Sequence, residues 1–171
     1  MRISVPQPSL VLLIGPSGAG KSTFARKHFG RYEVLSSDYC RGLVSDDENE
    51  QAASGDAFDV LHFIAARRLR RHRVTVIDAT NVVAYVRRPL LAMARRYGIA
   101  AVAVVFDLPE QVCLARDRMR RKRSVGPVVL RRQIEQLRRS LSTLEEEDFR
   151  RIYVLRTADD VETAVVMRQP A

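Results

Sequence analysis

Residues 10–23 read LVLLIGPSGAGKST, an apolar run that leads directly into a glycine-rich segment. The segment Gly15-Pro16-Ser17-Gly18-Ala19-Gly20-Lys21-Ser22-Thr23 fits the pattern G-x-x-x-x-G-K-[ST]. Glycines let successive backbone N–H groups turn inward around a phosphate, and the next helix adds the positive end of its dipole. We expect Lys21 to reach the β- and γ-phosphates and the Ser22 hydroxyl to ligate Mg²⁺. The pattern predicts nucleotide binding, but it does not separate kinases from ATPases, GTPases or motors.

Four more apolar runs follow and alternate with stretches of helical spacing. The five predicted strands are residues 10–14, 33–35, 74–77, 101–106 and 152–155. The predicted helices are residues 22–29, 58–71, 87–97, 109–121, 128–144 and 159–167. Strands that are apolar throughout and alternate with helices are typical of a parallel sheet covered on both faces. The sequence therefore predicts an α/β three-layer sandwich with a five-stranded parallel sheet.

Length and composition limit the classes of protein to consider. The 171 residues, 46% of them hydrophobic, suffice for one sizeable core, so we expect a single domain over residues 1–171. No apolar run approaches the roughly 20 residues of a membrane span, no cleavable leader is recognisable, and we expect a cytoplasmic protein. Cys40 and Cys113 form no disulfide or metal pattern and read as reduced thiols.

The charge of the chain favours contact with phosphates. The formal net charge is +9, from 26 arginines and 3 lysines against 20 acidic residues. Such a charge suits nucleotides, nucleic acid or anionic lipid. A GC-rich genome would produce the same excess of arginine, so the clusters of arginine carry more information than the total.

Two aspartates follow predicted strands. Ligands of open parallel sheets bind at the carboxyl ends of the strands, and Asp38 and Asp78 both come at such an end. We assign Asp38 as the general base for an attacking hydroxyl and Asp78 to the outer shell of Mg²⁺ or Mn²⁺. Two structural alternatives stay open: Asp38 as a helix or turn cap, and Asp78 as a turn former with Thr80. Downstream, Ser45 and Glu48 have the spacing of a capping box and predict a helix start.

A cluster of arginines occupies residues 116–123, which read RDRMRRKR. On a helix, Arg116, Arg120 and Arg123 would lie within roughly 60° of one another as one basic stripe. Guanidinium groups suit phosphoryl oxygens, so we expect a helical lid, approximately residues 110–130, that closes over the triphosphate. A solvated helix face is the alternative. Residues 125–130 add apolar groups, which would pack on a terminal base or in the core.

Arg41 lies three residues beyond Asp38. The two side chains could contact the same acceptor: Asp38 would bind its hydroxyl group, and Arg41 would bind a neighbouring phosphate. A surface arginine is the alternative.

Together these segments resemble a known family. The run Ser37-Asp38-Tyr39-Cys40-Arg41-Gly42-Leu43-Val44-Ser45-Asp46-Asp47, the run Asp78-Ala79-Thr80-Asn81, the glycine-rich segment and the arginines are similar to the kinase module of bacterial polynucleotide kinase-phosphatase, an end-healing RNA repair enzyme. The resemblance covers residues 10–170. It implies an adenylate-kinase-like P-loop NTPase fold and transfer of the γ-phosphate of ATP or another NTP to the 5′-hydroxyl end of RNA or DNA.

The motifs and the resemblance together assign roles to individual residues, and the resemblance implies partners. Lys21, Asp38, Arg41 and Arg123 would be catalytic. Gly15, Ser17, Gly18, Ala19, Gly20, Lys21, Ser22, Thr23, Arg116, Arg120 and Arg123 would bind the nucleotide, and Ser22 and Asp78 would serve the metal. In the family, phosphatase and ligase-like modules follow in the same polypeptide. This chain has neither, and we interpret it as an excised N-terminal module or a stand-alone kinase, either monomer or homodimer, without a membrane partner.

Two other functions remain open at this stage. A kinase of small molecules would use the same loop and base, but it would need an enclosed polar pocket instead of an open basic groove beside Asp38. A nucleotide-gated nucleic-acid binding module would lack catalysis altogether.

Overall fold

A five-stranded parallel sheet forms the centre of the computed structural model, which describes residues 1–120 and 123–170. The strands lie in the order β3 (Val34–Ser36), β4 (Thr75–Asp78), β2 (Ser9–Ile14), β5 (Ala100–Phe106) and β6 (Arg151–Leu155). Every neighbouring pair is parallel. The predicted α/β class and the five-stranded parallel sheet are therefore confirmed.

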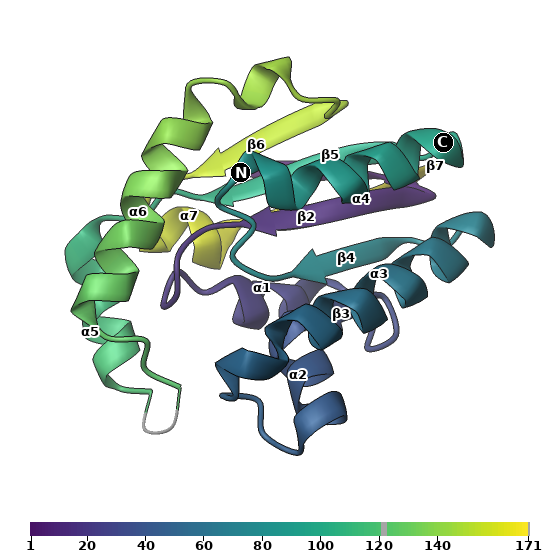
Figure 1. The fold of residues 1–171 in the computed structure, drawn as a ribbon. Helices are drawn as coiled ribbons and strands as arrows, with labels where there is room; N and C mark the ends of the chain where they lie inside the picture. The colour runs from purple at the N-terminus through teal and green to yellow at the C-terminus, as the bar shows by residue number, and fades with distance from the viewer. Residues whose placement is uncertain (121–122, 171) are drawn as a thin grey trace.

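Helices cover both faces of this sheet (Figure 1). They are α1 (Lys21–His28), α2 (Ser37–Ser45), α3 (Ser54–Arg70), α4 (Ala84–Arg96), α5 (Glu110–Arg118), α6 (Pro127–Leu141) and α7 (Ala158–Thr163), with short 3₁₀ turns at Gln51–Ala53 and Leu144–Glu146. None of the described helices is long and apolar enough to cross a bilayer.

The side chains of β2 divide the core into two parts, one on each face. Leu10, Leu12 and Ile14 pack with α3 and α4, whereas Val11 and Leu13 pack with α1 and α5. All five are completely buried. Successive side chains of a strand point to opposite faces, so an uninterrupted apolar run is what a central strand of a three-layer sandwich requires.

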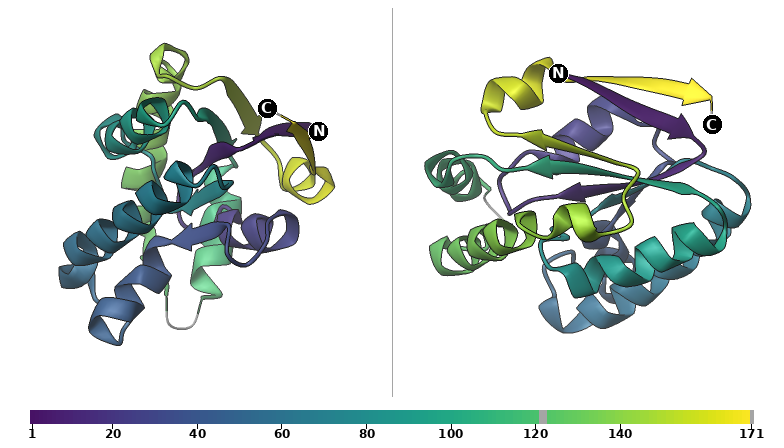
Figure 2. Two further views of the ribbon diagram at one scale, coloured as in Figure 1. Left: turned by 90° about the vertical axis from the view of Figure 1, so that its right-hand side faces the viewer. Right: turned by 90° about the horizontal axis from the view of Figure 1, so that it is seen from above.

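The two ends of the chain form a second sheet that the sequence analysis missed. β1 (Arg2–Gln7) pairs in parallel with β7 (Val165–Pro170), and the two strands lie side by side in Figure 2. The predicted last helix over residues 159–167 is therefore confirmed only in its first part, because α7 (Ala158–Thr163) ends at Thr163 and the strand β7 follows. Ile3 and Val5 of β1 are fully buried against the α1 side of the core, which gives this pairing its hydrophobic stabilisation.

The segment after β3 also differs from the prediction. Ser45 ends α2 instead of starting a helix, and Asp46 follows in the left-handed conformation with φ 59°. The Ser45 hydroxyl donates to the Arg41 carbonyl at 2.8 Å, a bond back into its own helix. The predicted capping box is thus wrong, and the next long helix begins at Ser54.

Candidate active site

A cavity with a volume of about 1040 Å³ lies beside the glycine-rich loop, at the carboxyl ends of the strands. In Figure 1 the arrowheads of β2, β4, β5 and β6 point toward this edge, where α5 and α6 also lie. The cavity gathers most of the residues singled out from the sequence: Ser17, Gly18, Gly20, Lys21, Ser22, Thr23, Asp38, Arg41, Asp78, Arg116, Arg120 and Arg123. Gly15 and the buried Ala19 belong to the loop but not to the cavity wall.

The glycine-rich loop runs between β2 and α1 with no space for side chains at its tightest points. A Cβ atom on Gly18 would lie 2.4 Å from the Cys113 carbonyl oxygen of α5, and Gly18 has φ +74°. A Cβ atom on Gly15 would lie 2.9 Å from Phe106 at the end of β5. The loop is therefore wedged between two elements, and the glycines are required by backbone geometry and by packing.

Lys21 is the first residue of α1 and is buried. Its ammonium group donates to the Pro16 carbonyl at 2.8 Å, so the side chain folds back over the loop. Burial lowers the pKa of Lys21 to about 8, with Arg120 acting in the same direction, while Asp78 and Asp38 oppose the shift. The charges of Asp38 and Arg120 thus both act on Lys21, with opposite effects on its pKa.

Asp78 is the last residue of β4 and is buried. Burial raises the pKa of this carboxyl group, whereas the Lys21 ammonium and the Ser22 hydroxyl oppose the rise. A hydroxyl and a carboxylate beside a phosphate-binding loop suit Mg²⁺, which keeps several waters and binds phosphate oxygens. The hydroxyl and the carboxylate are therefore ligands of the kind that this metal takes. No group of three or more acidic, cysteine or histidine side chains that could hold a metal occurs among the described residues.

Asp38 lies in the first turn of α2 and borders the cavity. Its carboxylate forms an ion pair with the buried Arg41, with 3.1 Å between Arg41 Nη1 and Asp38 Oδ1. The helix cap is Ser36, whose hydroxyl accepts from the Tyr39 N–H at 3.3 Å. The capping alternative for Asp38 and the surface alternative for Arg41 are therefore both wrong.

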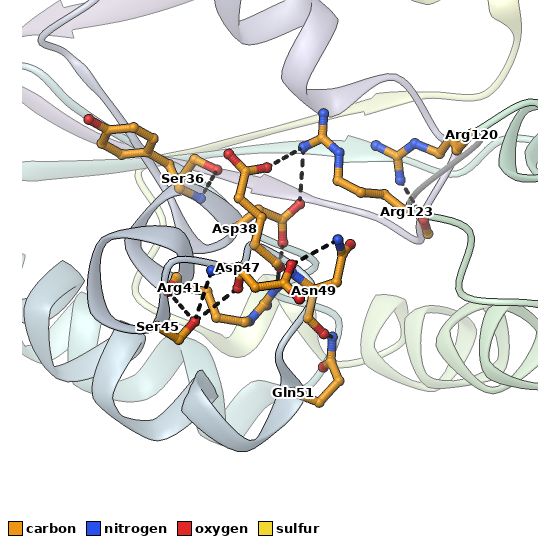
Figure 3. A network of polar contacts seen from close by, with 12 residues as sticks. Ser36, Asp38, Arg41, Ser45, Asp47, Asn49, Gln51, Arg120 and Arg123 are labelled. Carbon is orange, nitrogen blue, oxygen red and sulfur yellow. Dashed lines mark hydrogen bonds and ion pairs between the residues drawn. The ribbon is translucent and has the colours of Figure 1, made fainter.

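Arg123 reaches Asp38 from the other side of the cavity (Figure 3). Arg123 Nη1 lies 3.8 Å from Asp38 Oδ2 and 2.9 Å from Glu48 Oε2. The backbone carbonyl of Glu48 in turn accepts from Arg41. Glu48 was predicted to be a capping residue. Instead, its carboxylate binds Arg123 and its backbone carbonyl binds Arg41, both beside Asp38.

The three lid arginines do not form one helical stripe. Helix α5 ends at Arg118, and α6 begins at Pro127, so Arg120 and Arg123 lie in the connection between the helices. Arg121 and Lys122 of the basic run lie outside the described residues. The side chains of Arg116, Arg120 and Arg123 nevertheless line the same cavity. The helical-stripe prediction is wrong, while the predicted meeting of the arginines at the loop is observed.

The apolar residues 125–130 divide between the two roles considered for them. Leu130 is fully buried in the core, Val128 is exposed, and Val125 and Val129 line the cavity, as does Phe58 of α3. Apolar side chains therefore line the same cavity as the charged groups.

Two polar residues at the loop had no separate signal in the sequence. Gln133 of α6 accepts from the Ser17 backbone N–H at 2.8 Å. Asp117 of α5 accepts from the Ser17 hydroxyl at 3.1 Å. Asp117 lies within the arginine-rich run, and this sequence context predicts an exposed charge.

The parallel sheet, the glycine-rich loop with its lysine and the cavity at the strand ends together define a P-loop protein with the α/β fold of kinases. A family model described as an AAA domain matches residues 10–144, and the chain belongs to this family. No curated protein matches the sequence.

Three solved structures illustrate the similarity. A chain of the Pnkp1/Rnl/Hen1 RNA repair complex is 22% identical with a TM-score of 0.69, and the match covers 84% of this chain and 47% of that one. A gluconokinase from Sinorhizobium meliloti 1021 is 18% identical with a TM-score of 0.56 over 92% and 87% of the two chains. The APS kinase CysC of Mycobacterium tuberculosis, solved with AMPPNP and APS, is 25% identical with a TM-score of 0.52 over 67% and 70%. These similarities establish the kinase-like fold.

Proposed function

We propose that this protein is a polynucleotide 5′-hydroxyl kinase that transfers the γ-phosphate of ATP or another NTP to the 5′ end of RNA or DNA. The observation that carries the proposal is the grouping of Asp38, Arg41 and Arg123 in the same cavity as the glycine-rich loop and Lys21. The first group suits a hydroxyl beside a phosphodiester, and the loop with its lysine suits a triphosphate. Phe58, Val125 and Val129 line the same cavity and offer a surface for a terminal base.

In the proposed reaction the 5′-oxygen forms a bond to the γ-phosphorus as the bond from that phosphorus to the bridging β-oxygen breaks. Asp38 accepts a hydrogen bond from the hydroxyl and takes up its proton as the new bond forms. Arg41 binds the phosphodiester next to the terminal nucleoside. Lys21, Arg116, Arg120 and Arg123 stabilise the charge on the phosphoryl oxygens and on the departing diphosphate.

Ser22 and Asp78 would hold the magnesium ion that accompanies the nucleotide. Mg²⁺ supplies positive charge that neutralises the β- and γ-phosphate oxygens. Both residues line the cavity, and the Ser22 hydroxyl, in the first turn of α1, acts on the Asp78 carboxyl group.

The basic lining of the cavity supports a polyanionic acceptor. Among the residues that the structure describes, six basic side chains line it, namely Lys21, Arg26, Arg41, Arg116, Arg120 and Arg123, against the acidic Asp38, Glu48, Asp78 and Glu162. The similarity to a chain of an RNA repair complex points in the same direction.

A kinase of small hydroxyl compounds is the second candidate. The likeness to a gluconokinase and to an APS kinase favours it, because both share the fold over two thirds or more of this chain. Under that function Arg41 and Arg123 would bind an anionic group of the small substrate.

The deciding experiment supplies ATP labelled in its γ-phosphate together with an acceptor. One series of reactions contains 5′-hydroxyl RNA or DNA oligonucleotides, and the other contains gluconate or adenosine 5′-phosphosulfate. We expect label on the oligonucleotide 5′ end. Label only on a small compound, or on no acceptor, would overturn the proposal.

The Asp38→Ala variant separates a kinase from a nucleotide-gated binding module. We expect phosphoryl transfer to fall by a factor of about 10²–10⁴, the usual contribution of a general base. ATP affinity should remain nearly unchanged, because Asp38 addresses the acceptor. Unchanged activity of this variant would contradict the assignment, whereas Lys21→Ala should weaken both transfer and ATP binding.

A further inference from the structure

Asp117 is almost completely buried, with 2% of its surface exposed, although it lies within the basic run beside the cavity. A buried carboxylate is unfavourable unless hydrogen bonds compensate for the lost water. Asp117 accepts such bonds from two parts of the chain. Oδ1 accepts from the Ser17 hydroxyl at 3.1 Å and from the Val125 N–H at 3.3 Å, while Oδ2 accepts from the Ser124 hydroxyl at 2.8 Å and from the Gly126 N–H at 3.1 Å.

These bonds keep the carboxyl group ionised. Burial acts to raise the pKa of Asp117, but the bonds from Ser124, Val125, Gly126 and Ser17 outweigh it and hold the pKa below the ordinary value. An ionised carboxylate has no proton to donate, so the Ser17 hydroxyl must donate to Asp117. The direction of this hydrogen bond is therefore determined.

The direction matters because Ser17 also contacts Arg120. Arg120 Nη1 donates to the Ser17 hydroxyl oxygen at 2.8 Å. Since the hydroxyl proton points to Asp117, the oxygen lone pairs face the guanidinium group. A chain of two hydrogen bonds thus runs from Arg120 through Ser17 to Asp117.

Arg120 lies at the glycine-rich loop and lines the same cavity as Asp38. Arg116 Nη1 lies 3.4 Å from where a Cβ atom of Gly20 would stand, next to the start of α1, and Arg123 contacts Asp38. Figure 3 shows Arg120 beside Arg123, on the same side of Asp38. Arg120 thus joins the loop to the group of side chains around Asp38, as a contact with the last phosphate of a bound triphosphate requires.

We propose that Asp117 is a positioning residue that acts through Ser17 to hold Arg120 against the γ-phosphate, and that fixes Ser124, Val125 and Gly126 beside the loop. The inference rests on the proposed nucleotide function of this site, but not on the identity of the acceptor. One Arg120 nitrogen stays on Ser17, and the remaining N–H groups of the fork face the phosphoryl oxygens. The glycine-rich loop, α5 and the start of α6 are then joined at a single carboxylate.

The proposal makes a specific prediction for nucleotide affinity. In this proposal Arg120 acts mainly on the last phosphate, so its correct placement should favour a triphosphate over a diphosphate. The test measures the dissociation constants of the magnesium complexes of ADP and AMPPNP by calorimetry. We expect Asp117→Asn to reduce the preference for AMPPNP about tenfold, the loss expected for one hydrogen bond to a charged group, with ADP affinity changed by less than about threefold.

A double-mutant cycle tests whether Asp117 acts through Arg120. Arg120→Ala should reduce the same preference, and adding Asp117→Asn to it should reduce it by no more than about a further threefold. If the two substitutions reduced the preference for AMPPNP independently, so that their fold-changes multiplied, the proposal would be overturned. If Asp117→Asn does not fold, Ser17→Ala replaces it, because that variant keeps Asp117 bonded to residues 124–126 while removing the link to Arg120.

Leu69→Ala is the matched control for general destabilisation. Leu69 is fully buried on α3, and its loss should lower stability without changing the preference for AMPPNP over ADP. If Asp117→Asn alters ADP and AMPPNP binding equally, its role is structural and the proposal fails. The readout uses no acceptor, so a failed transfer to oligonucleotides would reject the proposed function and leave this test intact.

Discussion

Asp38 and Arg123 meet across the cavity, with 3.8 Å between Asp38 Oδ2 and Arg123 Nη1. The proposed base thus lies beside a side chain proposed to bind the donor, as an in-line transfer between the two requires. Arg123 also contacts Glu48 at 2.9 Å, and both of these side chains are partly exposed. Because an exposed ion pair contributes little to stability, we expect Arg123 to contribute to catalysis instead.

Arg123→Ala should therefore lower phosphoryl transfer by a factor of about 10²–10³, typical for the loss of one donor to a charged transition state. Its free energy of unfolding, measured with urea, should change by less than about 1 kcal/mol. Glu48→Gln is the control, because it weakens the ion pair and leaves the guanidinium in place. A loss of activity in Glu48→Gln as large as in Arg123→Ala would contradict the direct role of Arg123.

Lys21 should take up protons when nucleotide binds. Burial lowers its pKa to about 8, so close to half of the nucleotide-free molecules carry a neutral Lys21 at pH 8. Phosphate oxygens favour the ammonium form, and ADP binding at pH 8 should take up about half a proton. Calorimetric titrations in buffers of different ionisation enthalpy measure this uptake. Lys21→Met should show no proton uptake. Equal uptake by the variant would mean that another group binds the proton.

The same group should make stability depend on pH. The pKa of Lys21 is about 8 in the folded protein and near 10.5 in an ordinary environment, so between these values the unfolded chain binds more protons. The contribution of Lys21 to the free energy of unfolding must then rise with pH over this range. Subtracting the value for Lys21→Met at each pH isolates this contribution. A difference that falls from pH 8 to pH 10 would contradict the lowered pKa.

Gly18→Ala should destabilise the protein more than Gly98→Ala. Both glycines have positive φ, which costs a substituted residue about 1–2 kcal/mol. Nothing lies within 4 Å of the Cβ position at Gly98, whereas at Gly18 the Cys113 carbonyl oxygen lies 2.4 Å away. Only Gly18→Ala must displace backbone, and it should also weaken nucleotide binding. Equal losses in urea unfolding would show that α5 does not pack closely on the loop.

Arg87 should make a large contribution to stability away from the cavity. It is fully buried, forms an ion pair with Glu147 and donates to the Ser140 hydroxyl at 2.8 Å. Removal of one partner of a buried pair costs about 3–5 kcal/mol, which we expect for Arg87→Met. Arg139→Met, which breaks an exposed pair with Glu135, should cost less than about 0.5 kcal/mol. Similar unfolding free energies for the two variants would contradict the expected difference between the buried and the exposed ion pair.

Short-range patterns explain which parts of the fold were predictable. Strands β2, β4 and β5 are short, largely apolar and buried, and the helices between them are long enough to display helical spacing. Helix α2 was missed because it is only nine residues long, directly follows the three-residue β3 and contains Gly42, which lowers helix propensity. Strand β7 was taken for helix because its partner, β1, lies at the opposite end of the sequence.

The sequence by itself determined the strand, loop and helix of residues 10–28, because the reasons for its glycines, its lysine and its serine all lie within a few neighbouring residues. It also indicated Asp38, Asp78 and the lid arginines, since strand ends and clustered charges are local features. Only the tertiary structure decided that Arg123 meets Asp38, that Glu48 holds two arginines and that Asp117 is buried under the loop. Those relationships depend on contacts between segments far apart in the chain, and no spacing along the sequence records which distant segments will touch.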